Sequence, residues 1–335
     1  MAHQLDFSTG SAAIAFRGET PWHGYGETIQ PEDSIDVIRA KAKLAWQVER
    51  SPVQYADQLL GTHMMKNRHV LFRSDTHEAL SVVSDRYHVV QPQEVMEFYQ
   101  NLVRDMGFSI EVAGALQGGR KVWALANTGH QFKLRGDDEV KGYLLLATSY
   151  DGTMATQARF TSVRVVCNNT LTIASRGKAD VTVSHATKFD AARVQSQLGI
   201  QQWSAYKDLA EEAQVARVSI NTTADFLVQA YFNLRDKDEL REFNLNKDND
   251  TKVKRMLERV AGSIASAPGA RMESAYGTLW GALQAVTHDV DHSLPSRDRG
   301  SRLNKAWFGE GEAIKQRARS LTASYLMGRG LEVAA

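Results

Sequence analysis

The segment YLLLATSYDGTMATQARFTSVRVV, residues 143–166, decides the fold class of this chain. Its first part, Tyr143–Ser149, is apolar and of strand length, and residues 155–166 form a second β-rich run. Between the two runs lies Asp151-Gly152, a strong turn signal for a two-stranded hairpin. The segment therefore predicts two antiparallel strands joined by a turn at 150–153.

Two further hairpins are predicted before this one. Val70–Phe72 and Leu80–Val83 are β-rich runs that a short polar turn separates. Phe108–Ala115 and Lys121–Ala126 flank Gln117–Gly119, which is a second turn. Successive hairpins favour an antiparallel sheet, because short turns can join only antiparallel neighbours.

Helices are predicted around these hairpins. Pro92 suits the first position of a helix, and Gly107 is typical of a helix end. The apolar residues between them lie at helical spacing: Val95, Phe98, Leu102 and Met106. Ser34 is expected to cap an earlier helix, and the chain after Val166 is expected to turn helical through Thr170, Leu171 and Ala174.

From about Phe189 the chain is predicted to be mainly helical, with one of its helices starting at a capping box formed by Thr222 and Asp225. The fold class expected is therefore α+β: an antiparallel sheet built from hairpins with a packed helix, followed by a mainly helical C-terminal part. We expect three regions: an N-terminal arm and helix over 1–59, the antiparallel core over 60–185, and a helical region over 186–335.

Composition narrows the class of protein. The 335 residues are 43% hydrophobic and 24% charged, as in globular proteins, and the formal net charge is +1. Any contact with DNA would thus need a local basic patch. The single cysteine excludes intramolecular disulfides and fits a reducing compartment. No secretory signal and no apolar run of about 18 residues is visible. We expect a cytoplasmic protein without membrane association.

Several catalytic signatures are missing from the sequence. It contains no phosphate-binding loop of the form Gly-x-x-x-x-Gly-Lys-Ser/Thr, no Gly-x-Ser-x-Gly and no Cys-x-x-Cys. A nucleotide-driven motor, an α/β-hydrolase and a zinc-finger protein are not expected. The sequence does not decide whether the protein is an enzyme, although it favours a protein without catalytic activity. It indicates no cofactor.

Several segments together resemble a known family, the phage/plasmid-like proteins of unknown function. They are Met1-Ala2-His3, residues 18–24 (GETPWHG), residues 83–87 (VSDRY), residues 118–125 (GGRKVWAL), residues 149–152 (SYDG), residues 163–171 (VRVVCNNTL) and residues 306–309 (AWFG). The resemblance covers nearly the whole length. It implies a gene of phages, plasmids or integrated elements, and no assigned reaction. Tyr150 stands where the family more often has a histidine.

A looser similarity links the combination of hairpins and a helix to phage single-strand-annealing proteins. Single-strand binding needs cations for the phosphates and aromatic faces for the bases. A basic-aromatic set lies on or beside predicted strands: Arg86, Tyr87, Arg120, Lys121, Trp123, Arg159 and Arg164. The alternative is ordinary: the aromatics belong to the core and the arginines to the strand rims.

Three other features have a functional and a structural interpretation each. Trp22, His23 and Tyr25 form either a strap over a ligand or an anchor for the N-terminal arm. Cys167 is either a nucleophile or a core residue. As a nucleophile it would need His185 as its base and Asn168 and Asn169 as donors to the oxyanion. His288 and His292 share one helix face as zinc-binding histidines do, but no third ligand is evident, so they are weak metal candidates.

The C-terminal basic run is the clearest local positive bias: Arg297, Arg299, Arg302, Lys305, Lys315, Arg317 and Arg319. Trp307 and Phe308 lie between its two parts. The run could contact phosphates or a partner protein, or it could form a solvated helix face.

The leading hypothesis is a DNA-binding protein of a mobile element, which binds or anneals single-stranded DNA in recombination or replication and forms a homo-oligomer. One alternative is an interaction module for a host defence or replication protein, acting through Trp307 and Phe308. The other is a metal-dependent hydrolase using His288 and His292.

Overall fold

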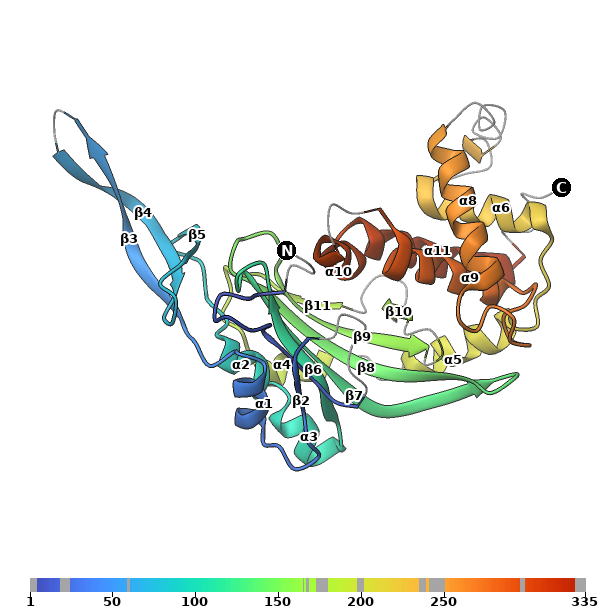
Figure 1. Cartoon of the computed structure of the whole chain (residues 1–335), viewed down its shortest axis with the longest axis horizontal. Helices are drawn as coiled ribbons and strands as arrows, with labels where there is room; N and C mark the ends of the chain where they lie inside the picture. The colour runs from blue at the N-terminus through green and yellow to red at the C-terminus, as the bar shows by residue number, and fades with distance from the viewer. Residues whose placement is uncertain are drawn as a thin grey trace. The chain divides into compact units, whose positions relative to one another are not determined.

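The computed structural model describes residues 5–18, 25–58, 61–164, 166, 169–172, 180–197, 202–234, 239–240, 251–295 and 299–328. The chain forms two compact units (Figure 1). Unit 1 comprises residues 1–129, 143–160 and 178–198, and unit 2 comprises residues 130–142, 161–177 and 199–335.

The largest sheet has the strand order β10-β9-β8-β7-β6-β1-β2, with β11 also paired to β9. Its strands are β1 (Ile14–Phe16), β2 (Glu27–Thr28), β6 (Ser109–Leu116), β7 (Lys121–Leu134), β8 (Asp138–Ser149), β9 (Thr156–Arg164), β10 (Asn169–Thr172) and β11 (Asp180–Val183). The hairpins predicted on either side of Gln117–Gly119 and of the Asp-Gly turn are confirmed, and so is the α+β class.

The helix predicted after Val166 is wrong where the structure describes that segment. Residues 169–172 form β10, which pairs antiparallel with β9, so that Asn169 lies opposite Arg164. The local pattern was compatible with a helix, but hydrogen bonding to the neighbouring strand decides the conformation. Ala174 lies outside the described residues.

The described residues of unit 1 form four short helices: α1 (Ile35–Lys41), α2 (Pro92–Glu97), α3 (Gln100–Met106) and α4 (Ala191–Gln197). Ser34 caps α1 by accepting a hydrogen bond from the backbone of Val37, as predicted. The single helix predicted after Pro92 is divided into α2 and α3 at Phe98 and Tyr99. The buried Tyr99 hydroxyl lies 2.7 Å from the carbonyl oxygen of Ala124 and thereby ties this break to β7.

A second sheet of unit 1 has the order β3-β4-β5, with β3 (Val48–Asp57), β4 (Gly61–Arg73) and β5 (Ala79–Ser84). The predicted pairing of Val70–Phe72 with Leu80–Val83 is confirmed. Strand β3 was not predicted. Figure 1 shows β3 and β4 running on together past β5 as a two-stranded ribbon. Most residues of this ribbon are exposed.

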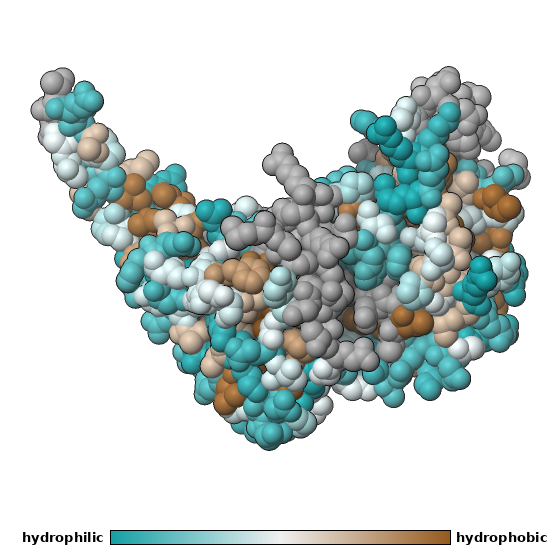
Figure 2. Space-filling model, viewed as in Figure 1, coloured by the Kyte–Doolittle hydropathy of each residue, from teal (hydrophilic) through white to brown (hydrophobic). Residues whose placement is uncertain are grey.

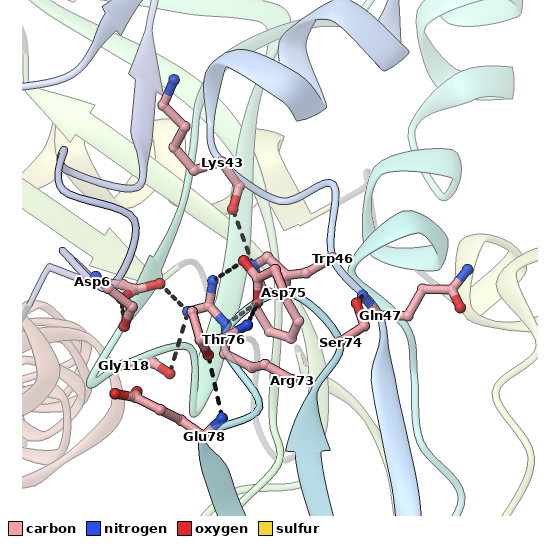
Figure 3. A network of polar contacts seen from close by, with 11 residues as sticks. Asp6, Lys43, Trp46, Gln47, Arg73, Ser74, Asp75, Thr76, Glu78 and Gly118 are labelled. Atoms are coloured by element: carbon pink, nitrogen blue, oxygen red, sulfur yellow. Dashed lines mark hydrogen bonds and ion pairs between the residues drawn. The ribbon is translucent and has the colours of Figure 1, made fainter.

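The base of the ribbon is fixed by a buried arginine (Figure 3). The Arg73 guanidinium is fully buried, forms ion pairs with Asp6 and Asp75, and lies 4.4 Å from the ring centre of Trp46. Burial lowers the pKa of Arg73, but the hydrogen bonds and charges of Asp75 and Asp6 outweigh it and raise the pKa overall. Arg73 therefore joins β4 to the N-terminal segment and to the segment that leads into β3.

The turn between β6 and β7 completes this network. The carbonyl oxygen of Gly118 lies 3.4 Å from the Arg73 guanidinium. Gly119 has a φ of +87°, and a Cβ at this position would lie 2.9 Å from the same guanidinium. Glycine is thus required here both by the backbone conformation and by the close approach of Arg73.

Unit 2 contains α5 (Gln202–Ala213), α6 (Ile220–Phe232), α8 (Thr251–Ser266), α9 (Leu279–His288), the π-helical turn η2 (Asp289–Ser293), α10 (Arg299–Phe308) and α11 (Glu310–Leu326). Helix α6 begins earlier than predicted, because Ser219 and not Thr222 caps it. None of the described helices has the length and apolar character that a membrane span requires.

The core of unit 2 contains a polar contact beneath aromatic packing. Asp138, at the start of β8, is fully buried and accepts hydrogen bonds from Trp280 (3.0 Å) and Ser274 (2.6 Å). The ring of Tyr206 contacts those of Trp203 and Trp280, with centroids 6.1 and 6.3 Å apart. Two donors satisfy this buried carboxylate and fix the start of β8 to α9.

Candidate nucleic-acid interface

The turn predicted at 150–153 forms a loop in unit 1 that is closed by hydrogen bonds. Ser149 and Met154 close it with two hydrogen bonds, of 2.7 and 3.1 Å, between the serine hydroxyl and the Met154 backbone. Asp151 accepts bonds from the backbone and hydroxyl of Thr153, and Gly152 has a φ of +72°. The loop therefore presents the Asp151 carboxylate at a fixed place.

Tyr87 and His185 stack on each other beside this loop. Their ring centroids are 4.4 Å apart and their planes differ by 16°. The Tyr87 hydroxyl donates to the carbonyl oxygen of Ser149 at 2.6 Å, while the two ring nitrogens of His185 lie 3.1 Å from the carbonyl oxygens of His88 and Met154. Burial, and next the Asp151 carboxylate, raise the pKa of Tyr87, so its hydroxyl remains a donor.

The structure places the residues of the predicted basic-aromatic set in different environments. Arg86 and Arg120 are exposed, Tyr87 is half-buried beside the loop, and Arg159 is half-buried on β9. The backbone of Arg164 pairs at the end of β9, and its side chain lies outside the described ones. Arg120 adjoins the loop, because its carbonyl oxygen accepts a hydrogen bond from the Tyr150 backbone.

Lys121 and Trp123 of the predicted set are buried in β7. They are only 6% and 2% exposed, so neither side chain offers a surface to phosphates or bases. Trp123 lies opposite Gly114 of β6, in the core. Burial lowers the pKa of Lys121, and Asp151 opposes this effect. The strand face on which both were expected to meet a ligand is covered, because both faces of β7 are buried over this stretch.

The ribbon supplies cations that the sequence pattern did not single out. Arg50 lies on β3, and Lys66 and Arg68 lie where β4 bulges away from its partner between the pairs Gln54–Met64 and Pro52–His69. All three are exposed, and none makes a side-chain hydrogen bond or ion pair with the residues that the structure describes. Without such partners, these three side chains do not contribute polar contacts to the stability of the fold.

With Arg86 and Arg120, these residues form a set that we call the unpaired cations: Arg50, Lys66, Arg68, Arg86 and Arg120. Arg86 and Arg120 are also free of side-chain partners among the described residues. The nearby acids are partly engaged, since Asp85 lies 3.0 Å from His69 and Asp75 is bound by Arg73. The unpaired cations all belong to unit 1.

Aromatic and apolar side chains accompany these cations. Tyr55 and His63 stack across the ribbon, with centroids 5.4 Å apart, and Tyr55 is 56% exposed. Met64 and Met65 are about half exposed, at 52% and 47%. Figure 2 shows apolar residues interleaved with hydrophilic ones along the ribbon. Strand period could have indicated these rings from the sequence, but Pro52 obscures the strand.

The metal candidates lie at the end of α9, where the π-helical turn begins. The rings of His288 and His292 are 4.7 Å apart, and burial, followed by the charge of His292, lowers the pKa of His288. The neighbouring acids are engaged: Asp289 with Arg259 and Tyr231, Asp291 with Lys315. Within the part of the chain that the structure describes, no group of three metal-ligating side chains is found.

The C-terminal basic run has four described side chains, those of Lys305, Lys315, Arg317 and Arg319, all in unit 2. Lys315 is 1% exposed and pairs with Asp291 at 2.8 Å, while Arg317 donates to the carbonyl oxygen of Ala230 at 2.7 Å. Burial lowers the pKa of Arg319. Lys305 donates to the carbonyl oxygen of Pro295. Lys315 is thus too buried for any of the three interpretations of the run, and Arg317 is held by the protein's own backbone.

Other predicted positions are half-buried or lie outside the description. Trp307 and Phe308 are half-buried and contact each other edge to face at 6.3 Å. Tyr25 is exposed and packs edge-on against Phe7. The following lie outside the described residues or side chains: Trp22, His23, Cys167, Asn168, Asn169, Arg297, Arg299 and Arg302.

Comparison with known proteins gives one match. No curated protein and no solved structure matches the chain. The model of a family described as a domain of unknown function, DUF932, matches residues 79–307. This match spans β5 to α10 and hence parts of both units. It covers more than half of the chain, which therefore belongs to the DUF932 family.

Proposed function

We propose that this protein binds single-stranded DNA, in the recombination or replication of a phage, plasmid or related mobile element, and that it acts without catalysing a reaction. The observation that supports this most strongly is that unit 1 carries both the unpaired cations and, on the ribbon, exposed stacked rings. We further propose that several copies assemble along one strand, with strand annealing as the outcome.

The chemistry of a single strand fits these residues. Its phosphates need cations that are not already neutralised, which Arg50, Arg68 and the other unpaired cations provide. Its bases have free faces that stack on aromatic rings, at about 1–3 kcal/mol per base. Tyr55 is available for such stacking because more than half of it is exposed. A duplex hides its base faces, so the rings favour the single strand.

Fluorescence anisotropy tests this proposal with a labelled 30-nucleotide thymidine strand and a duplex of the same length. We expect the strand to bind roughly tenfold more tightly than the duplex, as aromatic stacking predicts. The double variant R50A/R68A is expected to lose about tenfold or more in affinity. R104A is the matched control, because Arg104 is equally exposed in unit 1 but pairs with Asp105. Equal affinity of R50A/R68A and R104A would remove the ribbon from the interface.

A second candidate function is an interaction module for a host protein, and the ribbon rather than Trp307 and Phe308 supports it. Met64 and Met65 are exposed, and flexible methionines are common on surfaces that bind proteins. Pull-downs with three baits separate the two functions. A partner recovered by wild type and R50A/R68A but lost with M64S/M65S would favour the interaction module.

A further inference from the structure

Unit 2 contains a cavity that the proposed function does not use. It has a volume of about 590 Å³ and lies between α6, α8 and α9 and the segment that joins α8 to α9. Leu227, Leu257 and Ala282 contribute to its walls from the three helices, and Pro268 and Ala270 contribute from the connecting segment. All lining residues are described and belong to unit 2.

The lining of the cavity is free of charge. None of its residues is Asp, Glu, Lys or Arg, although these types make up 24% of the chain. Three hydroxyls in the lining already bond to the protein: Thr223 to Ser219, Thr278 to Ser274, and Ser263 to His288. A charged ligand would lose its hydration here without a compensating partner.

The mouth of the cavity is apolar and open to water. Ile220, which lines it, is 88% exposed, and Tyr276 and Ile264 are 67% and 40% exposed. Ile220 is the first residue of α6, where a polar residue would serve the helix equally well. Exposed apolar side chains around an apolar hollow are typical of a binding site.

We propose that this cavity binds a small, uncharged and mainly apolar molecule. Its volume lies in the range of about 300–1,000 Å³ that ligand pockets occupy. The absence of charged lining residues selects against ionic ligands, and burial of the apolar surface supplies the affinity. The site is independent of the ribbon, so its test does not depend on DNA binding.

The full-length chain is titrated with N-phenyl-1-naphthylamine, a neutral apolar dye whose fluorescence rises in apolar surroundings. We expect saturable binding of one dye per chain. A261F adds a ring to the lining of the cavity and is expected to weaken binding about tenfold or more. A265F is the matched control, because Ala265 lies one turn further along α8, is exposed and does not line the cavity.

A second pair of variants covers the case in which A261F perturbs the helix. I220D places a carboxylate at the mouth, on a residue so exposed that the fold tolerates it, and V215D is its control on an exposed residue outside the lining. Weaker binding by I220D alone supports the proposal. No saturable binding by wild type, or equal binding by I220D and V215D, overturns it. So does light scattering in which I220D dissolves a dimer, since a second copy would then cover the cavity.

Discussion

The buried charge of Arg73 is expected to be important for the stability of unit 1. Its side chain is fully buried between Asp6, which is 2% exposed, and Asp75. Replacing Arg73 by Met keeps the apolar stem but leaves a buried carboxylate without its partner. Such a change costs about 3–5 kcal/mol. We expect R73M to lower the free energy of unfolding by this amount in urea denaturation followed by circular dichroism.

The control for this experiment is R104M. Arg104 pairs with Asp105 at the surface, where an ion pair contributes about 0–1 kcal/mol. R104M should therefore unfold close to wild type. If R73M were no less stable than R104M, the network of Figure 3 would not be holding the base of the ribbon.

Asp75 gives the same network a pH dependence. Burial raises the pKa of Asp75, but the hydrogen bond and charge of Arg73 outweigh it and lower the pKa overall. A lowered pKa means that the carboxylate stabilises the fold fully above its unfolded value of about 3.9 and loses this effect as the pH falls. The stability difference between wild type and D75N should be largest at pH 7 and shrink towards pH 3.

E49Q is the control for the pH series. Glu49 is exposed and makes no side-chain bond to a described residue, so its replacement should change stability little. Urea midpoints at pH 7, 5 and 3.5 measure both differences. A difference for D75N that stayed constant over this range would contradict the coupling of Asp75 to Arg73.

Single residues show where sequence reasoning about the site fails. Trp123 and Lys121 matched the composition of a DNA-binding strand, but a sheet has two faces and composition does not reveal that both are covered. Arg50 carries no such local signal, yet it is exposed on an extended ribbon. Exposure depends on tertiary packing, which composition alone does not reveal.

At the level of elements, local signals predicted what local interactions determine. The Asp-Gly turn, Pro92 at the start of α2 and Ser34 as a cap each act through their own backbone neighbourhood, and the structure confirms them. Strand β3 was not predicted because Pro52 and its polar neighbours argue against a strand. Proline is nevertheless tolerated at the edge of a sheet, where β3 lies. Strand β10 was missed because its local pattern was compatible with a helix, whereas pairing with the preceding strand β9 decides its conformation.

The ribbon gives the sharpest test at this scale. Deleting residues 53–68 and joining Pro52 to His69 through Asn-Gly keeps the last regular pair before the bulge. The removed residues are mostly exposed, so we expect the thermal midpoint to stay near that of wild type. Affinity for the 30-nucleotide strand should fall about tenfold or more, because two cations and the Tyr55 ring are lost.

A full-length ribbon with M64S/M65S is the control for the deletion. It keeps Lys66, Arg68 and the Tyr55–His63 stack, and should bind the strand nearly as wild type does. Anisotropy reports the affinity, and circular dichroism reports the fold. A folded deletion variant that bound DNA as tightly as wild type would place the interface elsewhere in the protein.

For the molecule as a whole, charge sets a limit on how DNA can bind. The formal net charge is +1, so no long-range field draws a polyanion to the protein. In the proposed interface, attraction comes from the five unpaired cations. Each phosphate contact on a single strand adds about 0.7 to the slope of affinity against salt concentration on logarithmic axes.

Five contacts therefore predict a slope of about −3.5, which corresponds to a loss of roughly 100-fold between 50 and 200 mM salt. R50A/R68A should reduce the slope to about −2.1, since two contacts are gone, whereas R104A should leave it unchanged. Anisotropy titrations at four salt concentrations measure all three slopes. A wild-type slope near zero would mean that the cations do not meet phosphates. A slope much steeper than −3.5 would require further basic residues, because the unpaired cations cannot supply it.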